Sequence, residues 1–234
     1  MVLAATIDRF VFDAIGHLAT GTQTNYRSQL RRVGKAVVGA TLYPPTGTIP
    51  RPILRLPYKT SDVNALVSWA TSRSTDHMRR NAMALLALGL GAGLSSQEIT
   101  RLTGTDVVVD GDGVVIRVIG EKSRQVPVLR RWEERVVELA QEVGERPIVL
   151  PDRKQILKHA ISNFVERCSS DGAPGLTVQR LRTTWIINQM VAGTPLPALS
   201  AVSGVDPTQL ARYFALMPPV DLGDTRQRIR DAER

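Results

Sequence analysis

The stretch GLGAGLSSQEITRL, residues 89–102, joins an apolar segment to a polar one. Its first half ends an apolar run, residues 82–90, which predicts a buried helix. Ser95 and Ser96 begin a polar turn, and a second helical segment follows the turn. The apolar run is the longest in the chain, yet it has only 9 residues and contains Gly89. It is too short to cross a bilayer, so we expect no membrane partner.

The composition indicates a globular protein with a polyanionic partner. The 234 residues fit one large domain or two small ones, and a hydrophobic content of 43% suffices for a core. The 30 Lys and Arg residues against 22 Asp and Glu residues give a net charge of +8. This excess favours nucleic acid as the partner, the alternative being a basic protein that is merely well solvated.

The cysteine and histidine content argues against a metal site. The single cysteine, Cys168, excludes an internal disulfide framework. The three histidines, His17, His77 and His159, are far apart in the sequence, so we expect neither a metal nor another cofactor. The first residues, MVLAATIDRF, lack a charged n-region and a cleavage site, and we therefore expect a cytoplasmic protein.

Residues 24–38 have the periodicity of an amphipathic helix. Their apolar positions recur at spacings of four, three and four residues and predict one buried face: Tyr26, Leu30, Val33 and Val37. Their cations recur every four residues on another face: Arg27, Arg31 and Lys35. Apolar residues between positions 7 and 18 predict a partner helix, and we expect the cationic stripe to contact DNA.

The rest of the chain predicts a mainly α protein with a small three-stranded antiparallel sheet. Five prolines in residues 43–60 indicate an extended linker, so we place a boundary near residue 52. The two parts are a short helical segment with the linker, 1–52, and a main domain, 53–234. Three β-branched stretches separated by turns predict a meander. Further helices are expected at 131–143, 152–168, 177–191 and 206–216, before a charged tail at 221–234.

This order of elements resembles the tyrosine recombinase (phage integrase) family, in which a helical DNA-binding segment and a linker precede a mainly helical domain with one small sheet. Four segments carry the resemblance: RNAMALLALGLGAGLSSQEITRLTGTDV, GVVIRVIGEKSRQVPV, LTVQRLRTTWIINQMVAGT and LSAVSGVDPTQLARYF. They are similar to the first arginine box, the hairpin of the catalytic lysine, the His-x-x-Arg box and the segment that ends at the tyrosine nucleophile. The likeness is close over residues 55–217 and loose before them.

The resemblance implies that two of six catalytic positions are kept. The arginine of the His-x-x-Arg box falls on Arg182, and the nucleophile falls on Tyr213. The other four positions carry different residues: Ser95 for the first arginine, Glu121 for the lysine, Gln179 for the first histidine and Gly204 for the second His or Trp. Because these positions converge on one phosphate in the family, we expect Ser95, Gln179 and Gly204 to surround an empty catalytic cleft.

The chemistry of the family shows what these differences imply. Attack by a tyrosine hydroxyl on DNA phosphate builds negative charge on the phosphate oxygens, which arginine side chains stabilise. Losing one such donor costs roughly 10²–10³ in rate at comparable sites. We therefore expect strand cleavage to be lost and DNA binding to remain. The expected DNA contacts are Arg27, Arg31, Lys35, Lys122, Arg124, Arg180, Arg182 and Arg212.

Simpler interpretations of the same residues stay open at this point. Tyr213 is alternatively a core aromatic, and Arg182 is alternatively an arginine in a salt bridge. Arg101 is an alternative to Ser95 as the first arginine, but on a continuous helix its side chain begins about 9 Å too far along. Lys122 is an alternative catalytic lysine, because the hairpin of the family is mobile.

The leading functional hypothesis is a DNA-binding protein on a recombinase scaffold that no longer recombines. It would bind double-stranded DNA and act as a phage or plasmid repressor, or as an accessory factor of recombination. Self-association through the tail, 221–234, is expected by analogy with the family. One alternative is an active recombinase that uses Tyr213. The other is a protein-interaction module that has abandoned DNA.

Overall fold

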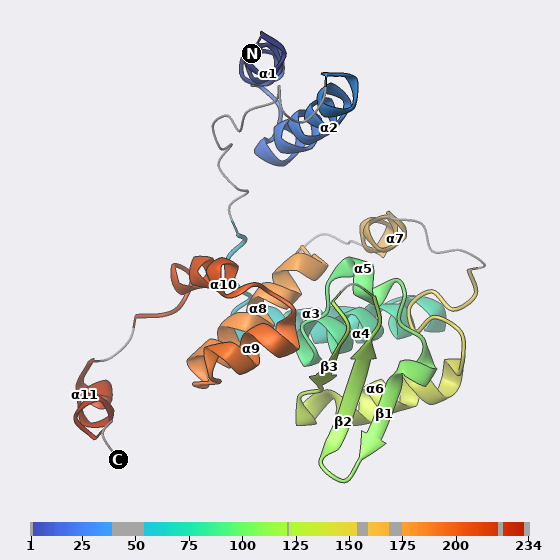
Figure 1. The fold of residues 1–234 in the computed structure, drawn as a ribbon. Coiled ribbons are helices and arrows are strands. Elements are labelled where there is room, and N and C mark those ends of the chain that lie inside the picture. Colours follow the sequence, from blue (N-terminus) through green and yellow to red (C-terminus); the bar gives the residue numbers. More distant parts are fainter. Residues whose placement is uncertain are drawn as a thin grey trace. The chain divides into compact units, whose positions relative to one another are not determined.

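The chain divides into two compact units, Met1–Ile53 and Leu54–Arg234, as seen in a computed structural model (Figure 1). The structure describes residues 2–38, 54–120, 122–153, 159–168, 175–219 and 222–231. Most of the predicted linker, together with Glu121 and Asp221, lies outside these residues. Among the described residues, no helix combines the length and the hydropathy that crossing a bilayer requires.

The first unit is a pair of helical segments joined by a turn. Helix α1 (Val2–Arg9) continues into a π-helical segment (Phe10–Ala14), and both contact α2 (Thr20–Val38). Ile7 and Val11 form the small buried core of this unit. Two hydrogen bonds of 2.6 and 2.9 Å from Arg27 to the carboxylate of Asp8 join the helices. Arg31 lies 3.7 Å from the same carboxylate.

The prediction that Tyr26, Val33 and Val37 form a buried face is wrong. These side chains are 47%, 61% and 75% exposed, whereas Arg27 on the cationic stripe is only 7% exposed. Helix α1 packs on the stripe, where Asp8 binds Arg27 and Arg31, whereas Leu30 alone of the predicted face packs against the core of this unit. The buried face of α2 is therefore formed by an ion pair together with one apolar residue.

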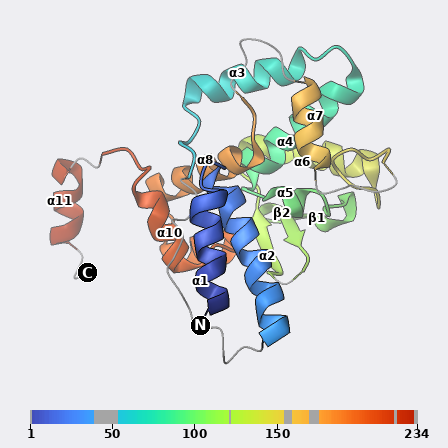
Figure 2. The same cartoon turned by 90° about the horizontal axis from the view of Figure 1, so that it is seen from above.

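The second unit is built around helix α4. Its elements in chain order are α3 (Thr60–Thr71), α4 (Asp76–Gly91), α5 (Ser96–Ile99), a 3₁₀ turn (Gly104–Asp106), β1 (Val107–Asp110), β2 (Gly113–Val118), β3 (Arg124–Pro127), α6 (Arg130–Val143), α7 (Ala160–Cys168), α8 (Val178–Val191), α9 (Leu196–Ser203), α10 (Pro207–Phe214) and α11 (Leu222–Arg230). Helix α4 contacts α3, α6 and α8 (Figure 2). Its residues from Ala84 to Gly91 are all buried, so the apolar run of the sequence is the centre of the core.

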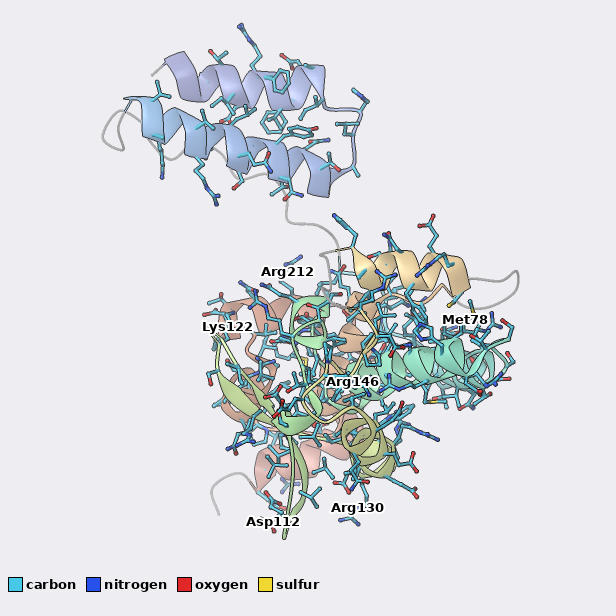
Figure 3. The ribbon with its side chains drawn as sticks, turned by 90° about the vertical axis from the view of Figure 1, so that its right-hand side faces the viewer. Met78, Asp112, Lys122, Arg130, Arg146 and Arg212 are labelled. Carbon is cyan, nitrogen blue, oxygen red and sulfur yellow. The ribbon has the colours of Figure 1, made fainter. Side chains whose placement is uncertain are left out.

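The predicted three-stranded meander is confirmed. The strands pair antiparallel in the order β1-β2-β3, with Val109 opposite Val114 and Ile116 opposite Val126. Helix α6 contacts β1 and β2. The two turns of the meander lie at opposite ends of the sheet, marked by Asp112 and Lys122 in Figure 3. The meander therefore brings Lys122 to one particular end of the unit.

Two helices differ from the prediction. The helix expected at 152–168 runs from Ala160 to Cys168, because the chain makes a turn at Leu150–Arg153, where Leu150 has a positive φ of 57°. Residues 154–158 lie outside the described part. Helix α9 (Leu196–Ser203) was not predicted as a separate helix. The described part of the tail forms α11.

Candidate nucleic-acid interface

A pocket of about 420 Å³ lies where α5, the β2–β3 turn, α8 and the end of α9 meet. Its polar and charged lining includes Ser95, Gln97, Glu98, Arg101, Lys122 and Arg182, with Gly204 beside them. Ser95 and Gly204 thus share one pocket with Arg182, whereas Gln179 lines a different hollow with Ser96 and Thr177. The expected convergence therefore holds for two of the three changed positions, and Gln179 is the exception.

Ser95 begins helix α5 as its N-cap. Its hydroxyl accepts a bond of 3.4 Å from the backbone N–H of Glu98, and its own N–H donates to the Glu98 carboxylate at 2.7 Å. This reciprocal pair is a capping box, which satisfies two backbone donors at the helix start. Ser95 therefore has a structural task and brings no charge to the pocket.

Glu98 is the centre of the charge network. Its two carboxylate oxygens bind two different arginines, Oε1 with Arg124 Nη1 at 2.7 Å and Oε2 with Arg182 Nη1 at 3.3 Å. Burial acts to raise the pKa of Glu98, but the hydrogen bonds from Arg124 and the Ser95 N–H, with the charge of Arg182, hold it below its ordinary value. Glu98 is consequently ionised and neutralises one of the two cations.

Arg182 is engaged inside the protein. Its Nη1 donates to the carbonyl of Gly93 at 2.6 Å, and its Nη2 donates to the carbonyl of Ser203 at 2.7 Å. Burial lowers the pKa of Arg182, and the charge of Glu98 opposes that shift. An arginine stays protonated in either case. This side chain thus ties the turn after α4 to the end of α9.

Arg124 occupies the space beside Gly204. Its side chain is only 8% exposed, and its Nε donates to the carbonyl of Val202 at 2.8 Å. Gly204 caps α9 in the left-handed conformation, with φ 66°. A Cβ added at position 204 would lie 3.1 Å from Cζ and from Nη1 of Arg124. The position that resembles the family's second His or Trp therefore faces a guanidinium instead of open space.

Tyr213 lies on α10 and is 9% exposed. Burial raises the pKa of its hydroxyl, and the nearby charges of Arg182 and Arg212 oppose that shift. Tyr213 does not line the pocket, and none of the pocket-lining residues is a histidine. The hydroxyl of Tyr213 therefore stays protonated at neutral pH.

The other predicted contact residues have different surroundings. Arg180 donates to the carbonyl of Leu56 at 2.8 Å and stacks over the ring of Tyr58 at 3.9 Å, so it holds the first residues of this unit. Lys122 donates to the carbonyl of Gly204 at 2.9 Å. Arg212 is partly exposed on α10 and Lys35 is exposed on α2. Glu121 lies outside the described residues.

Arg101 is the pocket residue that the sequence interpretation set aside. The argument against it assumed a continuous helix, but α5 ends at Ile99, and the chain turns at Thr100–Arg101. The turn places Arg101 in the same pocket as Ser95. The available signal was the short spacing from Ser95 to Thr103-Gly104, which leaves room for about two helical turns at most.

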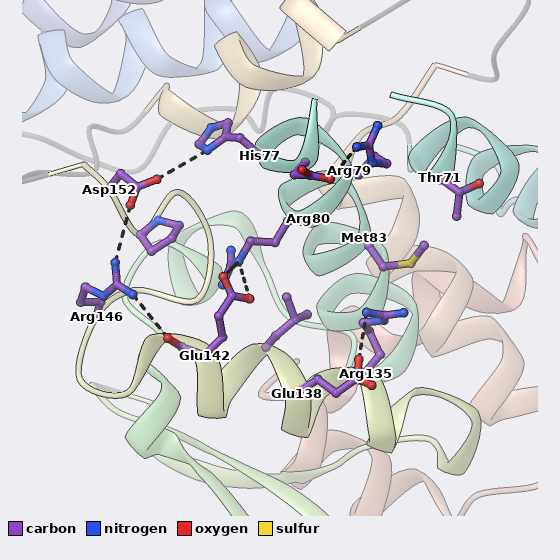
Figure 4. Close-up of a pocket in the computed structure, with 13 residues that line it drawn as sticks. Thr71, His77, Arg79, Arg80, Met83, Arg135, Glu138, Glu142, Arg146 and Asp152 are labelled. Atoms are coloured by element: carbon purple, nitrogen blue, oxygen red, sulfur yellow. Dashed lines mark hydrogen bonds and ion pairs between the residues drawn. The ribbon is translucent and has the colours of Figure 1, made fainter. Parts of the chain in front are cut away.

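A second hollow, of about 630 Å³, lies between α4, α6 and the turn at Pro151–Asp152 (Figure 4). Its charged side chains pair with one another: Arg79 with Asp76, Arg80 with Glu142, Arg135 with Glu138, and Arg146 with Asp152. Four cations thus face four carboxylates. This balance makes the hollow a poor site for a polyanion, in contrast to the pocket at Glu98.

Solved structures with the same fold are recombinases and integrases. The chain is similar to the XerH site-specific recombinase in a post-cleavage complex with palindromic difH substrate (TM-score 0.63, 14% identity, covering 99% of this chain and 70% of that chain). It is also similar to the Tn1549 transposon integrase in complex with circular intermediate DNA (TM-score 0.62, 14% identity, covering 98% and 86%). XerA recombinase gives a TM-score of 0.54 at 14% identity, covering 97% and 80%.

No protein-family model and no curated protein sequence matches the chain. The structural similarity nevertheless confirms the tyrosine recombinase fold, mainly α with a three-stranded antiparallel sheet. At sequence identities near 14%, this similarity shows the fold and does not show the activity, which depends on the residues of the pocket.

Proposed function

We propose that this chain binds duplex DNA on a tyrosine recombinase scaffold without cleaving it, as a phage or plasmid repressor or as an accessory factor of recombination. One observation carries the proposal: Glu98 binds both Arg182, which lines the pocket, and Arg124, which adjoins it, so these buried cations are held by a carboxylate within the protein. Strand cleavage needs arginine donors aimed at the phosphate oxygens. Here Arg182 uses both terminal nitrogens on protein acceptors.

DNA as the partner has two independent supports. The XerH and Tn1549 structures with this fold contain DNA, and this chain covers 70% and 86% of the protein chains in them. The net charge of +8 favours a polyanion. The affinity for DNA should fall linearly with salt in a double-logarithmic plot, with a slope that reports the number of phosphate contacts. No measurable affinity at low salt would favour a protein-interaction module instead.

The alternative of an active recombinase rests on Tyr213, whose hydroxyl lies in the field of Arg182. On a nicked suicide duplex, an active enzyme would accumulate a covalent protein–DNA adduct, whereas we expect none from the wild-type protein. We also expect Tyr213→Phe to retain DNA affinity and in-cell activity. The hydroxyl contributes at most about 0.5–1.5 kcal/mol as a hydrogen bond.

Denaturing gel electrophoresis detects the adduct, and Phe214→Leu on the same helix is the matched control, because the Phe214 side chain is 49% exposed. An adduct that forms with the wild type and disappears in Tyr213→Phe would replace this proposal by the active recombinase.

Self-association through the tail is part of the proposal. Helix α11 presents Ile229, which is 66% exposed, between Arg226 and Arg230. In a tail that packs against a second copy, Ile229 is the large apolar side chain of the described part of α11 that the partner would cover. We expect Ile229→Asp to lower the oligomeric state on DNA, measured by sedimentation velocity, and to leave the stability of the monomer unchanged. An unaltered distribution of species would remove the tail from the proposal.

A further inference from the structure

The cations that line the pocket or adjoin it form two groups with different surroundings. The inner group, Arg124 and Arg182, consists of side chains that are 8% and 15% exposed, and both are bound to Glu98. The outer group, Arg101 and Lys122, is exposed at the mouth. Glu98 is the sole carboxylate among the described residues that line the pocket, and the inner group already engages both of its oxygens. The outer cations are therefore left without an anion among the described residues.

Arg101 spans the mouth of the pocket. It follows the end of α5, and its Nη1 lies 3.9 Å from the point where a Cβ of residue 120 would stand, in the β2–β3 turn. No hydrogen bond or ion pair with another described residue engages its guanidinium, in contrast to Arg124 and Arg182. Lys122 lies in the same turn and reaches the carbonyl of Gly204 with one of its three donors. Two cations with unused donors thus flank one opening.

The outer group is the better binder of an external anion, because acceptors of the protein already engage the inner group. A phosphate that approached Arg182 would have to displace the Gly93 and Ser203 carbonyls and the Glu98 carboxylate. Such a displacement would leave these buried acceptors unpaired, at a cost of about 1–3 kcal/mol for each one. A phosphate that approaches Arg101 displaces only water. The fork of the guanidinium matches two phosphate oxygens.

We propose that Arg101 supplies the phosphate-binding cation that is absent at position 95, and that it holds one backbone phosphate of duplex DNA at the mouth of the pocket together with Lys122. The inference rests on the proposed function and names the residue that carries out one of its contacts. The phosphate would be bound at the exposed mouth, whereas Tyr213 is buried and does not line the pocket. Phosphate binding and strand cleavage would therefore depend on different places in the protein.

The test compares three single variants in binding to a short mixed-sequence duplex over a range of salt concentrations. Arg101→Gln is expected to weaken binding about tenfold at low salt, the loss of one charge-assisted contact. Its salt slope is expected to be smaller by about 0.9, which corresponds to one phosphate. Arg101→Lys keeps the charge and is expected to retain the slope. Arg135→Gln is the matched control, since it removes the same charge from a side chain that is 50% exposed and pairs with Glu138 in the other hollow.

Each outcome decides one point. If Arg101→Gln changes affinity and slope no more than Arg135→Gln does, the inference is overturned while DNA binding by the protein stands. If the wild type itself does not bind the duplex, the proposed function falls first and the inference with it. The thermal midpoint of Arg101→Gln is expected to match that of the wild type, because the side chain has no partner among the described residues. A lowered midpoint would contradict that placement of Arg101.

Discussion

Replacing Glu98 by glutamine is expected to lower the free energy of unfolding of the larger unit by about 3–5 kcal/mol, the usual cost of removing one partner from a buried ion pair. Both arginines that Glu98 binds are largely buried, with side chains 8% and 15% exposed. In Glu98→Gln these two guanidiniums face each other with no carboxylate between them. Urea denaturation, followed by circular dichroism, measures the loss.

Glu138→Gln is the matched control, because Glu138 pairs with a single arginine, Arg135, and the two side chains are 52% and 50% exposed. Exposed ion pairs contribute at most about 1 kcal/mol. The pH dependence is a second readout. The pKa of Glu98 is lower in the folded protein, so its contribution is complete above the unfolded value of about 4.3 and is lost as the pH falls through the folded pKa. Glu98→Gln should therefore lose less stability on acidification than the wild type. Equal losses in Glu98→Gln and Glu138→Gln would refute the network.

Gly93→Ala is expected to destabilise the same unit by about 2–5 kcal/mol. Gly93 has a φ of +59°, a conformation that costs an alanine about 1–2 kcal/mol. A Cβ at this position would lie 2.3 Å from Cε3 of Trp185, a side chain that is 3% exposed and fixed in the core. Displacing a packed ring adds about 1–3 kcal/mol. The change also moves the Gly93 carbonyl that accepts from Arg182.

Gly111→Ala serves as the control for Gly93→Ala, because no atom lies within 4 Å of a Cβ at position 111. Thermal denaturation of the two variants should separate them by several degrees. A Gly93→Ala protein as stable as Gly111→Ala would show that Trp185 does not pack against this turn.

The regular elements of the larger unit could be predicted because their sequence signals are local. The run that became α4 is continuously apolar over 9 residues, and the stretches that became the meander are rich in β-branched residues and bounded by turns. Helix α9 lacks such a signal, since LPALSAVS is short and nearly uniform in hydrophobicity. In α2 the periodicity was clear but misleading, because the buried face is formed by an ion pair with Asp8 of another helix together with one apolar residue.

The pocket was harder to predict than the elements that form it. The positions of Ser95, Arg182 and Gly204 followed from the resemblance to a family with the same fold. The pairing of Glu98 with Arg124 joins residues 26 positions apart, and no spacing rule in one sequence indicates it. Arg101 was misplaced because the end of α5 depends on a tight turn, and helix boundaries are the least predictable feature of a sequence.

The contact between Gly204 and Arg124 limits the order in which these two positions can be substituted. A histidine or tryptophan placed at position 204 meets both a left-handed backbone and a guanidinium 3.1 Å from its Cβ. Removing Arg124 first leaves Glu98 with one arginine fewer and β3 detached from the Val202 carbonyl. Either order of substitution passes through a less stable protein. Gly204 and Arg124 therefore constrain each other, because replacing either one alone lowers the stability of the protein.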